Sequence, residues 1–273
     1  MKLSVIIPNY NGALFIKETV LSFLGGFENI RIVVVDDAST DNSIEAISSI
    51  ENNKVHLICK SINGGFASSV NAGLRYCQDK DQEFVLVANS DIELSSDNFF
   101  QIIKSFDSFS DSNVAILGFL ESGDNVFKEN QNISGFLFAL RLSVVRSAGY
   151  LDEAFYMYGE EQDYFRRLLS SGFRIIQTGV EIKHNTEMSG NSSDSNSWLA
   201  IRNSIYLEAK NGCLFAVLKK IIVLFLIINR LYRKNSSDVS LNRVKRVGFI
   251  KGNVYLVKAI IWNIKTRASN VEP

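Results

Sequence analysis

Cysteine and proline are scarce in this chain of 273 residues, which has three of the first and two of the second. Cys59, Cys77 and Cys213 lack paired spacing, so neither a disulfide framework nor a CxxC zinc site is expected. With only Pro8 and Pro273, the chain has no proline-rich linker. A hydrophobic share of 46% and a charged share of 21% are typical of a folded protein and exclude general disorder.

An excess of charge of one sign is also lacking, because 29 basic side chains balance 29 acidic ones. The balance is a cancellation between two parts of the chain. Residues 1–210 carry 17 basic and 27 acidic side chains, whereas residues 211–273 carry 12 basic and 2 acidic ones. The length suits one α/β domain with an appendage. We therefore predict a domain over residues 1–210 and a basic helical segment over residues 211–273.

The sequence also lacks long uninterrupted runs of apolar residues. The run at residues 3–7 is too short for a secretion signal and meets Pro8, so we expect the first domain to be cytoplasmic. Residues 213–228 are interrupted by Lys219 and Lys220 and fall short of the roughly 20 apolar residues that cross a membrane.

The basic residues that follow this run favour a helix on an anionic membrane surface, which would place the protein at the inner face of the cell membrane. The alternative is a helix packed on the domain or on a second subunit. We do not expect a nucleic-acid partner, because no recognition motif accompanies the charge.

Short apolar runs alternate with amphipathic ones through the first 120 residues. Runs rich in Val and Ile predict strands over residues 3–7, 32–35, 55–58, 84–88 and 114–118. Apolar residues at helical spacing predict helices over residues 14–24, 42–50, 67–77 and 97–109, with Asp41 and Ser96 as N-caps of the second and fourth. This alternation predicts an α/β fold with a mostly parallel sheet and helices on both faces.

Beyond residue 118 the alternation ends. We predict strands over residues 136–142, 173–176 and 180–183, and helices up to residue 148 and over residues 160–171, 198–210, 213–234 and 241–265.

Four loops at the ends of predicted strands carry polar or acidic residues. They read PNYNG at 8–12, DDASTD at 36–41, NGGF at 63–66 and NSD at 89–91. Alone, an Asn-Gly pair is usually a turn and paired aspartates often cap a helix. In a doubly wound sheet, however, ligands bind beyond the carboxyl ends of the strands. Four such loops on one edge therefore favour a ligand site.

The first strand lacks a GxGxxG loop and the chain lacks GxxxxGK[ST], which argues against a dinucleotide dehydrogenase and a P-loop NTPase. A bound diphosphate would then need a cation. Asp91 offers a hard oxygen ligand suited to Mg²⁺ or Mn²⁺. The carboxylate of Asp37 and the ring of Tyr10 could hold a nucleoside.

Five segments in order resemble the serial motifs of glycosyltransferase family 2, which has the GT-A fold: VIIPNYNG, VVVDDASTD, NGGFASSVNAGL, LVANSDIEL and GYLDEAFYMYGEEQDYFRRL. Their spacing is most similar to a bacterial rhamnosyltransferase-like branch. The resemblance implies inverting transfer of a sugar from a UDP- or dTDP-linked donor. The acceptor would be a hydroxyl of a glycan or lipid-linked glycan, as in surface polysaccharide synthesis.

The resemblance also implies which residues hold the donor. Pro8, Tyr10 and Asp37 would bind the pyrimidine and ribose, and the loop at Asn63 and Gly64 would lie against the nucleoside. The metal-binding Asp-x-Asp of the family corresponds to residues 89–91. There Asn89 would contact the nucleotide and Asp91 would bind the metal, because only the last position keeps its carboxylate.

The segment YGEEQD at residues 158–163 resembles the family's Gly-Glu-Asp-x-Asp and implies Glu161 as the general base, with Glu160 as the alternative. Acids in a first helical turn can also serve only the helix dipole. His184 stands where family members contact the metal or the diphosphate. Arg202 belongs to an Arg-Asn pair of the branch and is either a phosphate contact or a solvated helix residue.

Two other functions stay open. A sugar-phosphate nucleotidyltransferase would carry a Gly-rich, Arg-containing loop after the first strand, which residues 8–12 do not offer. A non-catalytic module that binds a nucleotide or glycan on the same scaffold is compatible with Asn89 and Glu161, the two departures from the family pattern.

Overall fold

The computed structural model describes residues 2–26, 30–80, 82–121, 133, 135–183, 194–211, 214–229 and 249–269. The chain forms two compact units. Unit 1 comprises Met1–Tyr156 with Glu160–Ser189, and unit 2 comprises Met157–Gly159 with Gly190–Pro273. The division of function at residue 210 stays a prediction.

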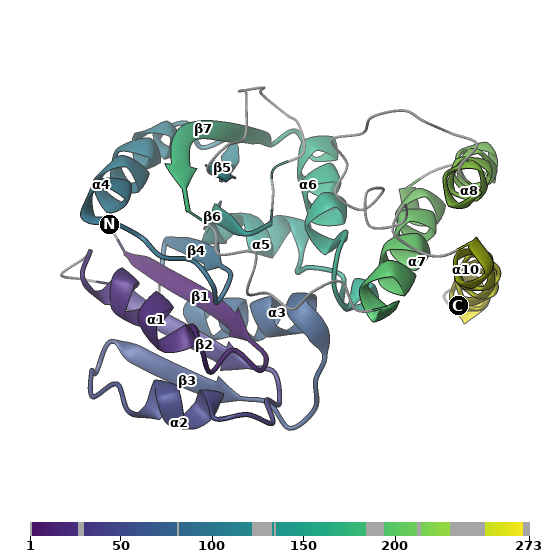
Figure 1. Ribbon diagram of the computed structural model, residues 1–273. Coiled ribbons are helices and arrows are strands. Elements are labelled where there is room, and N and C mark those ends of the chain that lie inside the picture. Colours follow the sequence, from purple (N-terminus) through teal and green to yellow (C-terminus); the bar gives the residue numbers. More distant parts are fainter. Residues whose placement is uncertain are drawn as a thin grey trace. The chain divides into compact units, whose positions relative to one another are not determined.

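Unit 1 is built on a seven-stranded sheet in the order β3-β2-β1-β4-β6-β5-β7 (Figure 1). Its strands are β1 (Leu3–Asn9), β2 (Ile30–Asp36), β3 (Val55–Cys59), β4 (Phe84–Ala88), β5 (Val114–Glu121), β6 (Leu137–Arg141) and β7 (Arg174–Ile182). Strand β6 runs antiparallel to both of its neighbours, and the other described pairs are parallel. The predicted α/β fold with a mostly parallel sheet is confirmed.

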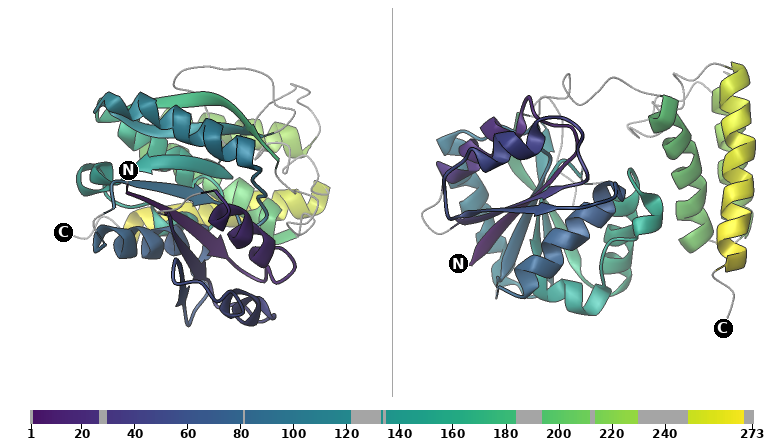
Figure 2. Two further views of the ribbon diagram at one scale, coloured as in Figure 1. Left: turned by 90° about the vertical axis from the view of Figure 1, so that its left-hand side faces the viewer. Right: turned by 90° about the horizontal axis from the view of Figure 1, so that it is seen from below.

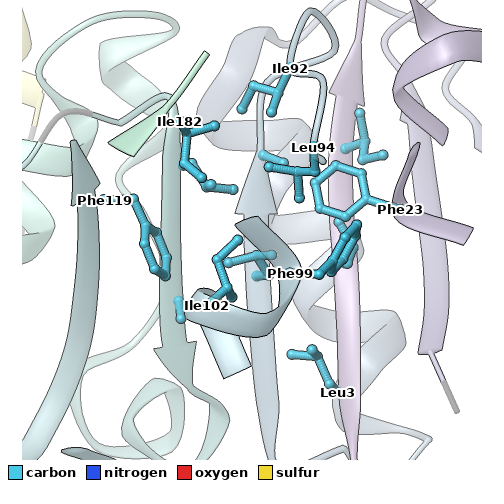
Figure 3. Close-up of a cluster of buried hydrophobic side chains, with 14 of the residues drawn as sticks. Leu3, Phe23, Ile92, Leu94, Phe99, Ile102, Phe119 and Ile182 are labelled. Atoms are coloured by element: carbon cyan, nitrogen blue, oxygen red, sulfur yellow. The ribbon is translucent and has the colours of Figure 1, made fainter. Parts of the chain in front are cut away.

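Helices cover both faces of this sheet, and Figure 2 shows α1 and α3 on opposite sides. One layer holds α1 (Ile16–Leu24), α2 (Ser43–Ser48), α4 (Ser96–Ser105) and the 3₁₀ turn η1 (Phe106–Ser110); the other holds α3 (Gly65–Gln78), α5 (Leu142–Ala148) and α6 (Glu160–Ser170), with the 3₁₀ turn η2 (Glu153–Phe155) before α6. Figure 3 shows part of the first core, in which the rings of Phe23 and Phe99 meet edge to face at 5.8 Å. Burial on both faces explains why the strands read as continuous Val and Ile runs.

Two predicted N-caps are wrong by one residue. Helix α4 is capped by Ser95, not Ser96, because the Ser95 hydroxyl accepts from the Asn98 N–H while Asn98 Oδ1 accepts from the Ser95 N–H, each at 3.2 Å. The N-cap of α2 is Asn42. Asn42 makes no side-chain capping bond, and it is the Asp41 carboxylate that accepts from the Ser43 N–H, at the first residue of α2, at 3.0 Å. Asp41 also accepts from the Ala13 N–H at 3.0 Å, which ties the loop after β2 to the loop after β1.

The two strands predicted over residues 173–176 and 180–183 form the single strand β7. Its pairing with β5 shifts register between Gly118 and Leu120. At this irregularity the Thr178 hydroxyl donates to the Gly118 carbonyl at 2.9 Å, so a polar residue is accommodated in mid-strand.

Unit 2 consists, in its described part, of α7 (Asp194–Asn211), α8 (Leu214–Ile228) and α10 (Phe249–Ser269), together with residues 157–159. Helix α7 packs against both α8 and α10 around Ile201, Leu224 and Ala259. The three predicted C-terminal helices are confirmed within the described residues. None of the helices described is both long and apolar enough to cross a membrane.

Candidate active site

The loops after β1 and β2 are joined through Asp36, the first residue of the aspartate pair. Asp36 is fully buried. It accepts from Asn9 Nδ2 at 2.9 Å and from the Ser39 hydroxyl at 2.6 Å. Ser39 in turn accepts from the Asn11 N–H at 2.9 Å. The buried carboxylate of Asp36 therefore links the loop after β1 to the loop after β2 through hydrogen bonds.

The loop after β4 lies beside the loop after β1. The Thr19 hydroxyl donates to the Ser90 carbonyl at 2.7 Å. A Cβ on Gly12 would lie 3.5 Å from Ser90 Oγ, which is ordinary van der Waals contact, and would clash only with Asn9 Oδ1 of its own loop, at 2.3 Å. The sheet thus brings three of the four predicted loops to one edge.

The fourth loop is held by Asp37, whose side chain is nearly buried. Its carboxylate forms an ion pair with Lys60 at 2.5 Å and accepts from the N–H groups of Gly64 at 3.0 Å and Gly65 at 2.7 Å. The Lys60 ammonium also donates to the Ser68 hydroxyl at 3.0 Å. A carboxylate has about four acceptor positions, so three of these are occupied by the chain itself.

Tyr156 approaches this loop from a distant part of the chain. Its hydroxyl donates to Asn63 Oδ1 at 2.8 Å, and the same oxygen accepts from the Gly65 N–H at 3.1 Å. The pKa of Tyr156 is raised, first by burial and then by the negative charge of Asp37 and by Tyr10. Tyr10, Asp37 and Tyr156 therefore share one environment.

Pro8 and Tyr10 complete the predicted nucleoside site. Pro8 lies in β1 opposite Val35 of β2 and is half-buried. Tyr10 follows the strand and is 49% exposed, so its ring can receive a ligand. The residues that the sequence predicts to bind the nucleoside therefore lie on neighbouring loops. Lys60 and Tyr156 lie next to them, but the sequence did not predict either as a site residue.

Glu161 lies beside the loop after β4. The Asn89 N–H donates to the Phe136 carbonyl at 2.8 Å, which fixes the half-buried Asn89 next to the start of β6. A Cβ on Gly135, the preceding residue, would lie 3.3 Å from Glu161 Cγ. The first turn of α6 is therefore close to the segment that carries Asp91, whose side chain is nearly buried.

The three acids at the start of α6 differ in their surroundings. Asp163 is fully buried and pairs with Arg167 at 3.0 Å; Arg167 also donates to the Tyr150 carbonyl at 2.7 Å. Glu160 is 4% exposed, whereas Glu161 is half-buried. Of the two candidates for the base, Glu161 is the more accessible.

Before α6 the backbone adopts left-handed conformations, with φ of 63° at Tyr156, 71° at Tyr158 and 98° at Gly159. Such values are uncommon outside glycine. Within unit 2, Asn203 Nδ2 donates to the carbonyls of Met157 at 2.8 Å and Tyr158 at 2.6 Å. These bonds support the strained segment that leads into the helix.

Arg202 belongs to unit 2 and is 8% exposed, so the alternative of a solvated helix residue is wrong. Its guanidinium lies 4.5 Å from the centre of the Trp262 ring and donates to Asn203 Oδ1 at 2.7 Å. Burial lowers the pKa of Arg202. The phosphate contact stays a prediction.

His184 lies outside the described residues. Among the residues that are described, no three His, Cys, Asp or Glu side chains gather into a metal site. Mg²⁺ is commonly held in proteins by one or two carboxylates together with substrate phosphates. Asp91 is the carboxylate on the loop after β4 that suits this use.

Curated relatives share parts of this sequence. An uncharacterized glycosyltransferase of Haemophilus influenzae is 33% identical over 98 residues, which are 35% of this chain and 38% of that protein. The minor teichoic acid biosynthesis protein GgaB of Bacillus subtilis is 34% identical over 38% of this chain and 12% of its own length. The chain therefore spans less than half the length of these two relatives. The low-salt glycan biosynthesis hexosyltransferase Agl10 of Haloferax volcanii is 25% identical over 85% of both chains.

Solved structures share the fold. The mannosyltransferase PcManGT from Pyrobaculum calidifontis, in complex with GDP-Man and Mn²⁺, matches 96% of this chain and 87% of its own with a TM-score of 0.63 at 15% identity. TarS 1–349 of S. aureus in complex with UDP-GlcNAc matches 95% and 81% with a TM-score of 0.57 at 21% identity.

The family described as "Glycosyl transferase family 2" matches residues 4–169, which is more than half of the chain and runs from β1 into the last turn of α6. The chain therefore belongs to glycosyltransferase family 2 and has the GT-A fold.

Proposed function

We propose that this enzyme transfers a sugar, with inversion at the anomeric carbon, from a nucleoside-diphosphate sugar to a hydroxyl of a glycan or lipid-linked glycan. The observation that carries this proposal is the meeting, on one sheet edge, of the polar loops around Asp37 and the accessible carboxylate Glu161. The nucleotide sugars in the two solved structures, GDP-Man and UDP-GlcNAc, support a donor of this class.

The nucleoside would bind against Tyr10, Pro8 and the loop of Asn63 and Gly64. Asp37 keeps about one acceptor position beyond its three bonds, which is enough for a base N–H or a ribose hydroxyl. Asn89 would complete the contact with the nucleotide. We propose a UDP- or dTDP-linked donor, as the resemblance to the rhamnosyltransferase-like branch implies.

A divalent cation, Mg²⁺ or Mn²⁺, would be held by Asp91 and, outside the described residues, by His184. When bound, such an ion neutralises negative charge that develops on a departing diphosphate. Mn²⁺ is present in the PcManGT complex. Arg202 is retained as a further phosphate contact, although its packing on Trp262 also serves the fold.

Glu161 would act as general base, with the less exposed Glu160 as the alternative. The Glu161 carboxylate takes the proton of the acceptor hydroxyl while the oxygen attacks the anomeric carbon. The bond from that carbon to the diphosphate oxygen breaks, and its electron pair leaves with the diphosphate. A single displacement of this kind inverts the anomeric configuration.

The acceptor and the location complete the proposal. GgaB and Agl10 are described as proteins of teichoic acid and glycan biosynthesis, which supports an acceptor in surface polysaccharide synthesis. We place the enzyme in the cytoplasm, peripheral on the inner face of the cell membrane. Family membership argues against the nucleotidyltransferase, whereas metal-dependent release of nucleoside diphosphate would distinguish transfer from a non-catalytic module.

The donor site is tested by a thermal-shift panel of UDP, dTDP and GDP with and without Mn²⁺, since a ligand that binds the native state raises its stability. We expect a shift with UDP or dTDP that Mn²⁺ enlarges. Absence of a shift with all three nucleotides contradicts the donor site.

The base is tested with Glu161→Gln, which should keep the nucleotide shift while transfer falls by about 10²- to 10⁴-fold. The control is Glu45→Gln on the exposed side of α2, which should leave both unchanged. Full transfer activity in Glu161→Gln would exclude Glu161 as the base. The same measurement on Glu160→Gln would then test the alternative, because loss of transfer in that variant would identify Glu160 as the base.

A further inference from the structure

Helix α8 carries an exposed apolar face. Leu224, Ile227 and Ile228 are buried, yet the opposite side is not polar. At 3.6 residues per turn, five large exposed residues fall within an arc of about 100°. They are Leu214, Phe215, Leu218, Ile222 and Phe225, with exposed fractions from 46% to 73%.

Helix α10 repeats this arrangement over a greater length. Its buried side holds Gly252, Leu256, Ala259 and Asn263. The outer side carries an apolar stripe at helical spacing, made of Ile250, Val254, Val257, Ile261 and Ile264, with exposed fractions from 47% to 78%. Single exposed apolar residues are ordinary on protein surfaces, but continuous stripes on two helices of one unit indicate an interaction surface.

A row of lysines runs beside the stripe on α10. Lys251, Lys258 and Lys265 are all exposed and are spaced by seven residues, so they lie on one side of the helix. Neither α8 nor α10 contains an Asp or Glu. The surface is therefore apolar and positive, without acids to balance it.

We propose that the outer faces of α8 and α10 bind an anionic lipid bilayer, with the apolar stripes in the headgroup region and the lysine row at the lipid phosphates. Lysine stems can lie along apolar surface while their ammonium groups reach the headgroups. A second copy of this chain is a poorer partner, because facing copies would bring the lysine rows together. Neither described helix can cross a membrane, so the helices lie on the bilayer.

This inference rests on the proposed membrane-surface location but not on the transfer reaction. It assigns the membrane contact to α10 as well as to α8, which lies within the apolar run at residues 213–228 that the sequence analysis considered. The full-length protein is tested by co-sedimentation with vesicles of phosphatidylcholine alone and with added phosphatidylglycerol. We expect strong binding only to the anionic vesicles, weakened by salt.

Two variants test the proposed faces. Lys251→Gln, Lys258→Gln and Lys265→Gln in combination should weaken binding on the order of 100-fold, because each lysine near an anionic surface strengthens it about fivefold. Val257→Ser with Ile261→Ser should weaken binding at least about tenfold by removing apolar groups from the interface. A matched control neutralises three exposed lysines of unit 1, Lys17, Lys80 and Lys104, and should bind nearly as well as wild type.

If the lysine variant and the unit 1 control bind anionic vesicles equally well, the assignment of the faces is wrong. If the wild-type protein does not bind these vesicles, the proposed membrane location is wrong as well. A dimer that Val257→Ser with Ile261→Ser converts to monomer, with vesicle binding unchanged, would identify the face as a contact between copies and contradict the proposal. The UDP thermal shift, measured on each variant, checks folding and separates these outcomes from failure of the donor site.

Discussion

Replacing Gly65 with alanine should disrupt the junction between the loop after β3 and the chain before α6. Gly65 has a φ of +83°, and an added Cβ would lie 2.2 Å from the Tyr156 carbonyl oxygen. The left-handed conformation alone costs a residue with a side chain about 1–2 kcal/mol. The clash is with backbone, so the loop must move, and overpacking of this kind costs about 1–3 kcal/mol more. We expect the free energy of unfolding to fall by about 2–5 kcal/mol in total.

Gly172 provides a matched control for the backbone part of this cost. It follows α6 with a φ of +84°, and an added Cβ would meet no heavy atom within 4 Å. Gly172→Ala should therefore lose only about 1–2 kcal/mol. Urea unfolding followed by circular dichroism compares the two variants, and their difference measures the clash with Tyr156.

The two variants should also differ in nucleotide binding. The Gly65 N–H donates to Asp37 at 2.7 Å, so movement of this loop should abolish the UDP thermal shift in Gly65→Ala and leave it in Gly172→Ala. If both variants lose the same stability and both keep the shift, the close contact between Gly65 and Tyr156 does not organise the site.

Three further perturbations test other parts of unit 1. Lys60→Met leaves the buried carboxylate of Asp37 without its cation and should cost up to about 3 kcal/mol in urea unfolding, whereas Lys60→Arg should retain most of the stability. The pKa of His56 is lowered from 6.5 by burial and by two nearby cations. The unfolded chain therefore takes up the proton first as pH falls, so stability should decrease from pH 7.5 to 5.5, and His56→Gln should flatten this decrease. Burial raises the pKa of Cys77 to about 11, so a thiol reagent at pH 8 should leave Cys77 unmodified until urea unfolds the protein, as peptide mapping would show.

The sheet of unit 1 was predictable because its strands are buried on both faces and therefore consist of uninterrupted apolar residues. Val33, Val34 and Val35 in β2 are each fully buried. Strand β7 was predicted as two strands because its polar centre interrupts that pattern. The Thr178 hydroxyl is satisfied there by donating to the Gly118 carbonyl and accepting from the Val180 N–H, at a register shift that the sequence does not reveal.

The site was predictable only in part. Asp37 and Asn63 could be found because polar residues at the ends of buried strands stand out from their surroundings. Lys60 could not, because a lysine after a strand reads as surface until Asp37 is known to lie within 2.5 Å. Tyr156 was also missed, because its hydrogen bond to Asn63 crosses 93 residues and depends on a left-handed backbone.

The acidic residues of the motifs differ in their burial and in their hydrogen-bond and ion-pair partners within the protein. Asp36 is buried and bonded to Asn9 and Ser39, and Asp163 is buried and paired with Arg167. These carboxylates hold the chain in place, and a ligand would have to displace their partners. Glu161 lies half-buried beside Gly135, where a Cβ would lie 3.3 Å from Glu161 Cγ. Neighbouring residues of a helix point about 100° apart, so the difference in burial between Glu160 and Glu161 follows from their places on α6. Glu161 is thus the more accessible of the two candidate bases, and the Glu161→Gln measurement decides between its proposed role in transfer and a role in the helix alone.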